Sequence, residues 1–224
     1  MAWSDILPFM GVAIRCGDLS LTAMTPDDIP GLLAAAGRGI VPDGSGYPFI
    51  TDWALLPRAE REASSTQFYF SSWAAASPER LELMMVVREG DTIMGAQDLR
   101  VADFAVRRTG FTGSWLARDF HGRGIGTRMR QLVCAFAFDE LGALEMRTEA
   151  YADNPASNRV SQKTGYVEFD RARVNRLGEP AVEVRYRLTA DQLTRPAEPI
   201  TFDGGPALRR YLGVTGGQSA MSRS

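Results

Sequence analysis

Cysteine and histidine, two residue types that often carry catalysis or metal binding, are scarce in this sequence. The 224 residues include two cysteines, Cys16 and Cys134, and one histidine, His121. The cysteines are far apart and have no metal-ligand spacing, so they indicate a reducing compartment or simple core packing, and no metal site is expected. With a single histidine, a serine or cysteine nucleophile activated by an imidazole base is not favoured either.

Long apolar runs and an excess of one charge are also missing. No segment approaches the length of a membrane span, and the N-terminus has no basic region or cleavage site of a signal peptide. The net charge of −2 gives no indication of nucleic acid or of an anionic membrane as a partner. With 45% hydrophobic and 23% charged residues, we expect a globular cytoplasmic protein with one main domain.

The most informative stretch is a glycine-rich loop between a strand pattern and a helix pattern. An apolar, β-prone run precedes Gly122, Gly124 and Gly126, and apolar residues at helical spacing follow from Met129. Alternate glycines allow positive φ and close approach of a ligand, and the first turn of the helix offers free N–H groups. The pattern therefore predicts an anion site, most naturally for a phosphate or pyrophosphate.

Known phosphate-binding loops differ in their spacing. A P-loop is excluded because no Lys-Ser/Thr pair follows in register, and the dinucleotide fingerprint would need glycine at Thr127. His121-Gly-Arg-Gly-Ile-Gly126 resembles the Gln/Arg-x-x-Gly-x-Gly/Ala loop of the GNAT N-acyltransferases, with His121 in place of Gln or Arg. An ordinary glycine-rich helix cap is the alternative interpretation.

A second motif about 25 residues later supports the same family. Asp153-Asn-Pro-Ala-Ser157 is a helix start, and Lys163-Thr-Gly-Tyr166 ends that helix. This motif resembles the second signature of the GNAT branch that includes the ribosomal-protein N-terminal acetyltransferases (RimJ/RimL-like). Within that branch the sequence is most similar to actinobacterial acetyl- and succinyl-transferases. The likeness extends over roughly Leu81 to Leu188.

The resemblance implies roles for particular residues. The strand before the loop would pair its main chain with the pantetheine arm of coenzyme A, the loop amides would hold the pyrophosphate, and Asn154 would bind pantetheine. Ser157 would face the sulfur and protonate the leaving thiolate; as alternatives, Asn154 is an N-cap and Ser157 a first-turn helix serine. The implied cofactor-binding residues are Ser114, Trp115, Leu116, His121, Gly122, Arg123, Gly124, Ile125, Gly126, Thr127, Asn154 and Ser157.

The general base is open on sequence alone. Glu145, Arg147, Glu149 and Tyr151 alternate on one face of a strand, and Glu149 is the first candidate. Asp98, an acid inside an apolar strand, is the second, because a buried acid there would need a partner. Structural ion pairs, or water acting as the base, are the alternatives.

The element order predicts one mixed sheet. Strand and helix patterns follow one another as β, αα, βββ, α, β, α, ββ, which predicts an α/β (α+β) arrangement, a mostly antiparallel sheet of about seven strands flanked by helices, as in the GNAT fold. The GNAT domain is expected over residues 1–190. Residues 191–224 form an extension with a short strand near Ile200–Phe202, a helix near Pro206–Leu212 and a disordered tail.

The leading function is direct transfer of an acyl group, with acetyl-CoA as donor, to a primary amine of a small molecule or peptide N-terminus. A succinyl-CoA donor would need a cation near the acyl end, for which Arg100, Arg147 and Arg176 are candidates. A degenerate acyl-CoA-binding module remains open, as does a homodimer. The acceptor site is expected between the loop of residues 37–53 and the hairpin turn of residues 175–180.

Overall fold

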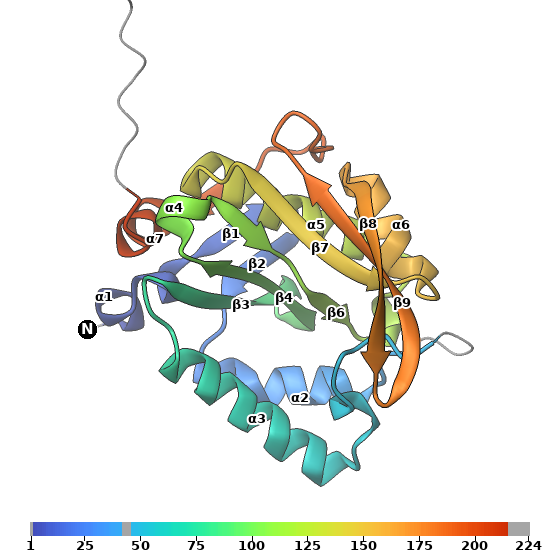
Figure 1. Cartoon of the computed structure of the whole chain (residues 1–224). Coiled ribbons are helices and arrows are strands. Elements are labelled where there is room, and N and C mark those ends of the chain that lie inside the picture. Colours follow the sequence, from blue (N-terminus) through green and yellow to red (C-terminus); the bar gives the residue numbers. More distant parts are fainter. Residues whose placement is uncertain (1, 42–45, 215–224) are drawn as a thin grey trace, which may run out of the picture.

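One mixed β-sheet forms the body of the protein, which the computed structural model describes over residues 2–41 and 46–214 (Figure 1). The strand order is β10-β1-β2-β3-β4-β5-β7-β9-β8, and β6 pairs with β4. Within the described residues β5 and β7 form the single parallel pair, and every other pairing is antiparallel. The expected GNAT arrangement is confirmed. Ten strands are described instead of about seven because the first predicted strand is the pair β1 and β2, a later strand is interrupted, and β10 is added.

The first half of the chain builds four neighbouring strands of the sheet, β1 to β4. The segment before Pro26 folds into α1 (Trp3–Ile6), η1 (Pro8–Gly11), β1 (Ala13–Cys16) and β2 (Leu19–Ala23). Thr25 caps the turn η2 (Pro26–Asp28), which continues into α2 (Ile29–Gly37). After η3 (Trp53–Leu55) come α3 (Arg58–Ala74), β3 (Arg80–Glu89), β4 (Thr92–Ala102) and α4 (Phe104–Arg107).

The second half contains the two motifs found in the sequence. It comprises β5 (Thr109–Phe111), β6 (Ser114–Leu116), η4 (Arg118–Phe120), α5 (Ile125–Phe136), the π-helical turn η5 (Ala137–Leu141), β7 (Glu145–Tyr151), α6 (Pro155–Thr164), β8 (Val167–Arg176) and β9 (Glu179–Leu188). As expected, α6 begins at the Asn154 cap, and Gly165 ends it at φ 105°.

The strand predicted before the glycine loop is not continuous: it is broken at Thr112 and Gly113. Thr112 N–H donates to Arg147 O on β7, whereas Gly113 O and N–H bond Asp98 on β4. The chain therefore leaves β7 and stays with β4. As a result β5 pairs with β7, β6 pairs with β4, and β6 and β7 diverge.

Gly95 permits this path of β6. A Cβ at position 95 would lie 2.1 Å from Trp115 O and 2.8 Å from Leu116 Cα. The main chain of β6 runs beside β4 at a distance that a side chain at position 95 would prevent.

The end of the chain returns to the first strands. Thr201–Asp203 forms β10, which pairs with Ala13–Arg15 of β1, and α7 (Gly205–Tyr211) packs beside η1 and η5. A strand and a helix therefore occur where the sequence predicts them. The predicted disordered tail, residues 215–224, lies outside the described residues.

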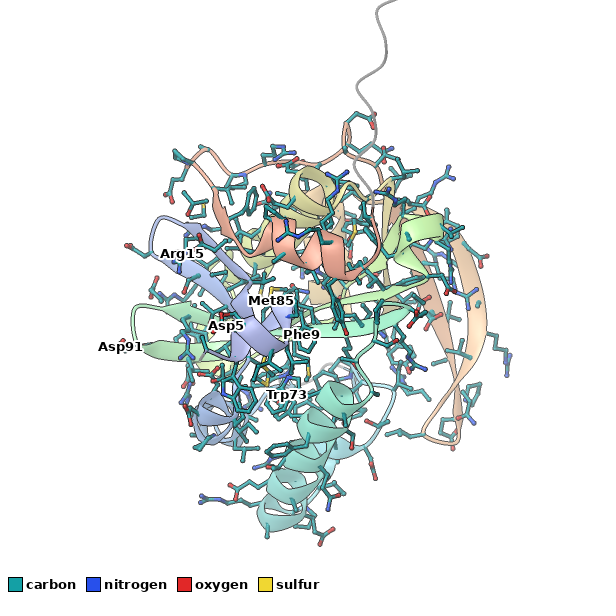
Figure 2. The ribbon with its side chains drawn as sticks, turned by 90° about the vertical axis from the view of Figure 1, so that its left-hand side faces the viewer. Asp5, Phe9, Arg15, Trp73, Met85 and Asp91 are labelled. Carbon is teal, nitrogen blue, oxygen red and sulfur yellow. The ribbon has the colours of Figure 1, made fainter. Side chains whose placement is uncertain are left out.

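Helices cover both faces of the sheet, and alternate residues of β3 enter two separate cores. Leu83, Met85 and Val87 belong to the larger cluster with the buried face of α5, whereas Met84 and Val86 pack beneath α2 and α3. Figure 2 shows Met85 inside the body and Asp91 at the outer turn between β3 and β4. Within the described ranges, no helix has the length and apolar character needed to cross a membrane.

Candidate active site

A cavity of about 1040 Å³ passes between β6 and β7. Its lining includes Gly124 and Ile125 at the start of α5 and Phe68 and Tyr69 of α3, helices that cover opposite faces of the sheet. The diverging strands therefore leave an opening that connects the two faces. Of the residues predicted for the site, Arg123 alone is missing from the lining.

Two of the three glycines of the loop have the positive φ that the sequence predicts, and Gly126 lies in the first turn of α5. Gly122 and Gly124 have φ values of 75° and 78°, which L-residues with a side chain rarely adopt. A Cβ at either position would meet no protein atom within 4 Å, so these glycines border open space. The first hydrogen bonds of α5 run from Thr127 and Arg128 N–H to Gly124 O, and Ile125 and Gly126 N–H precede them. This is the geometry of an anion site at a helix N-terminus.

His121 and Arg123 differ in their relation to the cavity, since His121 belongs to its lining and Arg123 does not. His121 Nε2 lies 2.9 Å from Leu116 O, which ties the loop to the end of β6. Arg123 is outside the cavity lining, forms an ion pair with Glu89 at 3.4 Å and lies over the ring of Phe120.

The start of α6 faces the same opening. Asn154 Oδ1 accepts a hydrogen bond from Ser157 N–H at 3.1 Å, so the N-cap interpretation of Asn154 is confirmed. Both residues also line the cavity, and the capping bond leaves the amide NH₂ of Asn154 and the hydroxyl of Ser157 outside it. Capping and ligand contact are compatible for this pair.

Both candidate bases line the cavity, but they differ in how firmly they are held. Asp98 accepts a 2.5 Å hydrogen bond from Gly113 N–H, and its carboxylate lies 3.5 Å from Arg100 Nε. The side chain of Glu149 is 42% exposed, and its closest cation, Arg185, is 3.9 Å away. Burial raises the pKa of both carboxyl groups, and the neighbouring Glu183 raises that of Glu149 further.

Several polar residues of the lining were missed in the sequence, among them Glu82, Gln97 and Arg130. Burial, followed by the charge of Asp98, raises the pKa of Glu82. Gln97 is fully buried and Arg130 is 3% exposed. Alternation along β4 places Gln97 in an otherwise apolar position, and the same reasoning that singled out Asp98 would have found it.

The cations suggested for a succinyl donor do not gather in the cavity. Arg100 lines it, beside Asp98. Arg147 lies outside its lining and pairs with Glu145 at 2.6 Å, and Arg176 pairs with Asp153 at 2.8 Å.

Aromatic side chains form the wall on the α3 side. The ring of Trp53 lies 6.0 Å from that of Trp115 and 5.1 Å from that of Phe49. Phe68 and Ile50 are half or more exposed at the same part of the lining. The loop predicted as an acceptor wall thus borders the cavity through residues 48–53.

The residues present fit coenzyme A. Open space beside Gly122 and Gly124 suits a pyrophosphate, and diverging strands leave main-chain groups for an extended arm. Two buried polar atoms of the lining, Gln97 Oε1 and Arg130 Nε, have no hydrogen-bond partner among the described residues. Within those residues, no group of His, Cys, Asp or Glu has the arrangement of a metal site.

Comparison with known proteins identifies the family. The model of the acetyltransferase (GNAT) domain matches residues 18–167, which is more than half of the chain. The chain therefore belongs to the GNAT acetyltransferase family.

The match to an individual curated relative covers a smaller part of the chain than the match to the family. The protein named "Putative ribosomal N-acetyltransferase YdaF" of Bacillus subtilis (strain 168) is 32% identical over 68 residues, which is 30% of this chain and 37% of that protein. The match thus spans little more than a third of that relative's length.

Two solved structures share the fold. The ribosomal L7/L12 α-N-protein acetyltransferase RimL in complex with coenzyme A has a TM-score of 0.59 at 16% identity, covering 79% of this chain and 96% of that one. The Vibrio cholerae spermidine N-acetyltransferase in complex with CoA and spermine has a TM-score of 0.61 at 14% identity, covering 78% and 97%.

Proposed function

We propose that this protein is an acetyl-CoA-dependent N-acetyltransferase that acts on a primary amine. The observation that carries the proposal is the cavity itself, which runs from the glycine loop at α5, between β6 and β7, to the carboxylates on the α3 side. The donor and the amine would enter from opposite faces and meet where the strands part. Direct transfer between two bound substrates needs this arrangement and requires no nucleophile from the protein.

The residues that would hold the donor lie along one path. Main-chain N–H groups from Gly122 to Gly126 would bind the pyrophosphate, since Thr127 N–H is already bonded to Gly124 O, and the free edge of β6, Ser114 to Leu116, would pair with the arm. Asn154 would bind the arm from α6. The bound donor supplies an activated thioester carbonyl close to Ser157.

In the reaction, the amine nitrogen forms a bond to the acyl carbon, the carbon–sulfur bond breaks, the amine loses a proton and the thiolate gains one. We propose that Glu149 accepts the proton that the amine loses. Its raised pKa makes the carboxylate a stronger base, and its closest cation is 3.9 Å away. Asp98 is the second candidate, although Gly113 N–H and Arg100 already hold its carboxylate. Ser157 is assigned the proton that the thiolate takes up.

The lining favours a substrate in which the amine is attached to an apolar group. Glu82, Asp98 and Glu149 attract a cationic amine, while Phe49, Trp53 and Trp115 offer apolar surface. A small amine and a peptide N-terminus both fit this description. The same proposal includes two further points. The protein is placed in the RimJ/RimL-like branch, nearest to its actinobacterial members, and residues 1–190 are assigned as the catalytic unit.

The test is a titration of the purified protein with acetyl-CoA and with succinyl-CoA in a calorimeter, followed by turnover assays with a panel of amines. We expect acetyl-CoA to bind and to be consumed only when an amine is present. Binding of neither thioester would overturn the proposal. Binding without turnover over a broad panel of amines would identify an acyl-CoA-binding module instead.

A further inference from the structure

Large apolar side chains lie exposed in the cavity on its α3 side. Ile50 is 70% exposed and Phe68 is 50% exposed, and both line the cavity. Single exposed apolar residues are common on protein surfaces, but a group of them inside a cavity is typical of a ligand site. The acceptor is the ligand expected on this side, so this wall bears on its chemical class.

Aromatic rings extend this wall from the loop before α3 to β6. Phe49, Trp53 and Trp115 follow one another, with ring centroids 5.1 and 6.0 Å apart. Leu56 and Met84 add aliphatic side chains to the same part of the lining. Rings in such an arrangement suit a flat apolar group, which can pack against them by its face or its edge.

The register of the sheet places carboxylates at a fixed distance from this wall. Trp115 on β6 is opposite Ala96 on β4, and Asp98 is two residues further along β4 on the same face. Glu82 on β3 is opposite Arg100, another two residues along. Two residues of a strand span about 6.6 Å, so the acids begin one such step beyond Trp115. An amine that reaches them must therefore be separated from the apolar group by a short chain.

The negative charge of Glu82 is incompletely compensated. Arg100 lies 3.5 Å from Asp98, whereas Glu82 accepts a hydrogen bond of 3.4 Å from the neutral hydroxyl of Ser72 on α3. Burial and the neighbouring charge of Asp98 raise the pKa of Glu82. An ammonium group in the cavity would supply the positive charge that this carboxylate lacks.

The separation of acids from apolar surface argues against a polyamine. A polyamine carries several ammonium groups along one chain, and each of them needs water or an acceptor. Ile50, Leu56 and Met84 would exclude water from a second ammonium group without replacing it by a hydrogen bond. Asp52 also lines the cavity, so a polyamine is the competing substrate in the test.

We infer that the acceptor is a primary amine on a short alkyl chain that ends in an aromatic ring. Its ammonium group would lie beside Glu82 and Asp98, and its ring would pack against Trp53, Phe68 and Trp115. The inference rests on the proposed function, because it names the acceptor class of the same site. Glu82 would hold the substrate, whereas the loss of the amine proton stays with the base of the proposed reaction.

Steady-state rates with a matched panel of amines test the inference. 2-Phenylethylamine and 4-phenylbutylamine carry the ring, n-propylamine lacks it, and spermidine has further amino groups instead. At saturating acetyl-CoA we expect kcat/KM for the better phenylalkylamine to exceed that for n-propylamine about 10–100-fold, as for one buried aromatic group. Spermidine should be no better than n-propylamine.

Phe68→Ala and Phe70→Ala form a matched pair of variants. Both residues lie on α3 and are 50% and 52% exposed, but Phe68 lines the cavity and Phe70 does not. Phe68→Ala should lower kcat/KM for the phenylalkylamines about tenfold and that for n-propylamine by less. Phe70→Ala should leave both unchanged.

Glu82→Gln tests the other end of the site. We expect kcat/KM to fall about tenfold for every amine of the panel, as for one lost hydrogen bond to a charged group, with the dissociation constant of acetyl-CoA unchanged. Wild-type rates in this variant would overturn the placement of the ammonium group.

Two results would overturn the inference and leave the proposed function standing. One is equal kcat/KM for n-propylamine and both phenylalkylamines, and the other is a preference for spermidine or for a short peptide with a free N-terminus. If acetyl-CoA does not bind, or binds and no amine is acetylated, the proposed function itself fails.

Discussion

Arg176 at the end of β8 clamps Asp153 at the start of α6 through two hydrogen bonds of 2.8 Å each. The same guanidinium lies 4.6 Å from the ring centroid of Tyr151 and within 3.4 Å of Tyr47 O. One side chain therefore joins the hairpin turn, the helix that carries Ser157 and the loop that lines the α3 side of the cavity. The pair connects the expected acceptor elements to the part of the chain that carries Ser157.

Removing this clamp should have a small, pH-dependent effect on stability. The hydrogen bonds from Arg176 lower the pKa of Asp153, so the pair stabilises the fold above the unfolded pKa, and that contribution is lost as the pH falls through the lower folded value. Because Asp153 is half exposed, we expect Arg176→Gln to cost about 0.5 kcal/mol at pH 7 and almost nothing near pH 2. Urea unfolding at the two pH values measures this, and an equal cost at both would contradict it.

Replacing Gly124 with valine should abolish coenzyme A binding. The Cβ would enter the space assigned to the pyrophosphate, and φ of 78° adds strain of about 1–2 kcal/mol. Gly178→Val is the matched control: Gly178 has φ of 93°, also borders open space, and lies in the β8–β9 turn outside the cavity lining. Calorimetry should show lost coenzyme A binding for Gly124→Val only. Similar losses for both variants would mean that backbone strain, and not a blocked phosphate site, causes the loss.

Ser157→Ala tests the proposed acid. The helix cap uses Ser157 N–H and not its hydroxyl, so the substitution leaves the capping bond to Asn154 in place. We expect kcat to fall about 10²-fold while the dissociation constant of acetyl-CoA changes less than threefold. Equal losses in turnover and in binding would make Ser157 a binding residue only.

The pH profile of kcat/KM distinguishes the two candidate bases. A base must be unprotonated, so the rate should fall as the pH drops through the pKa of Glu149, which burial raises above the usual glutamate value. Glu149→Gln should reduce kcat about 10²–10⁴-fold and remove this acid limb. If Asp98→Asn removes the limb and Glu149→Gln keeps it, the roles are reversed.

The sequence was informative where local chemistry determines structure. Gly122, Gly124 and Gly165 adopt the positive φ values that their positions suggested, and Asn154 and Pro155 start a helix as such residues do. Alternation along β7 correctly separated Glu149 from Thr148, because a strand exposes its two faces in turn.

Features that depend on distant contacts could not be predicted. The strand breaks at Thr112 and Gly113 because adjacent main-chain groups bind different strands. Thr112 N–H bonds Arg147 on β7, whereas Gly113 bonds Asp98 on β4. Arg130 appears as one more polar position on an amphipathic helix, and only the fold shows that it is buried beneath the diverging strands. Arg123 shows the reverse case, since a charge inside the motif pairs with Glu89 outside the cavity.

The divergence of β6 and β7 means that the sheet is interrupted in its middle rather than only at its edges. The ladder between β5 and β7 ends at Phe111 and Arg147, and β6 does not pair with β7, so amides of β6 and β7 that face the opening are protected by no neighbouring strand. A donor arm lying there would act as the missing strand. Amide hydrogen exchange in residues 114–116 should then slow sharply when coenzyme A is added, and the protein would be a sheet that its own substrate completes.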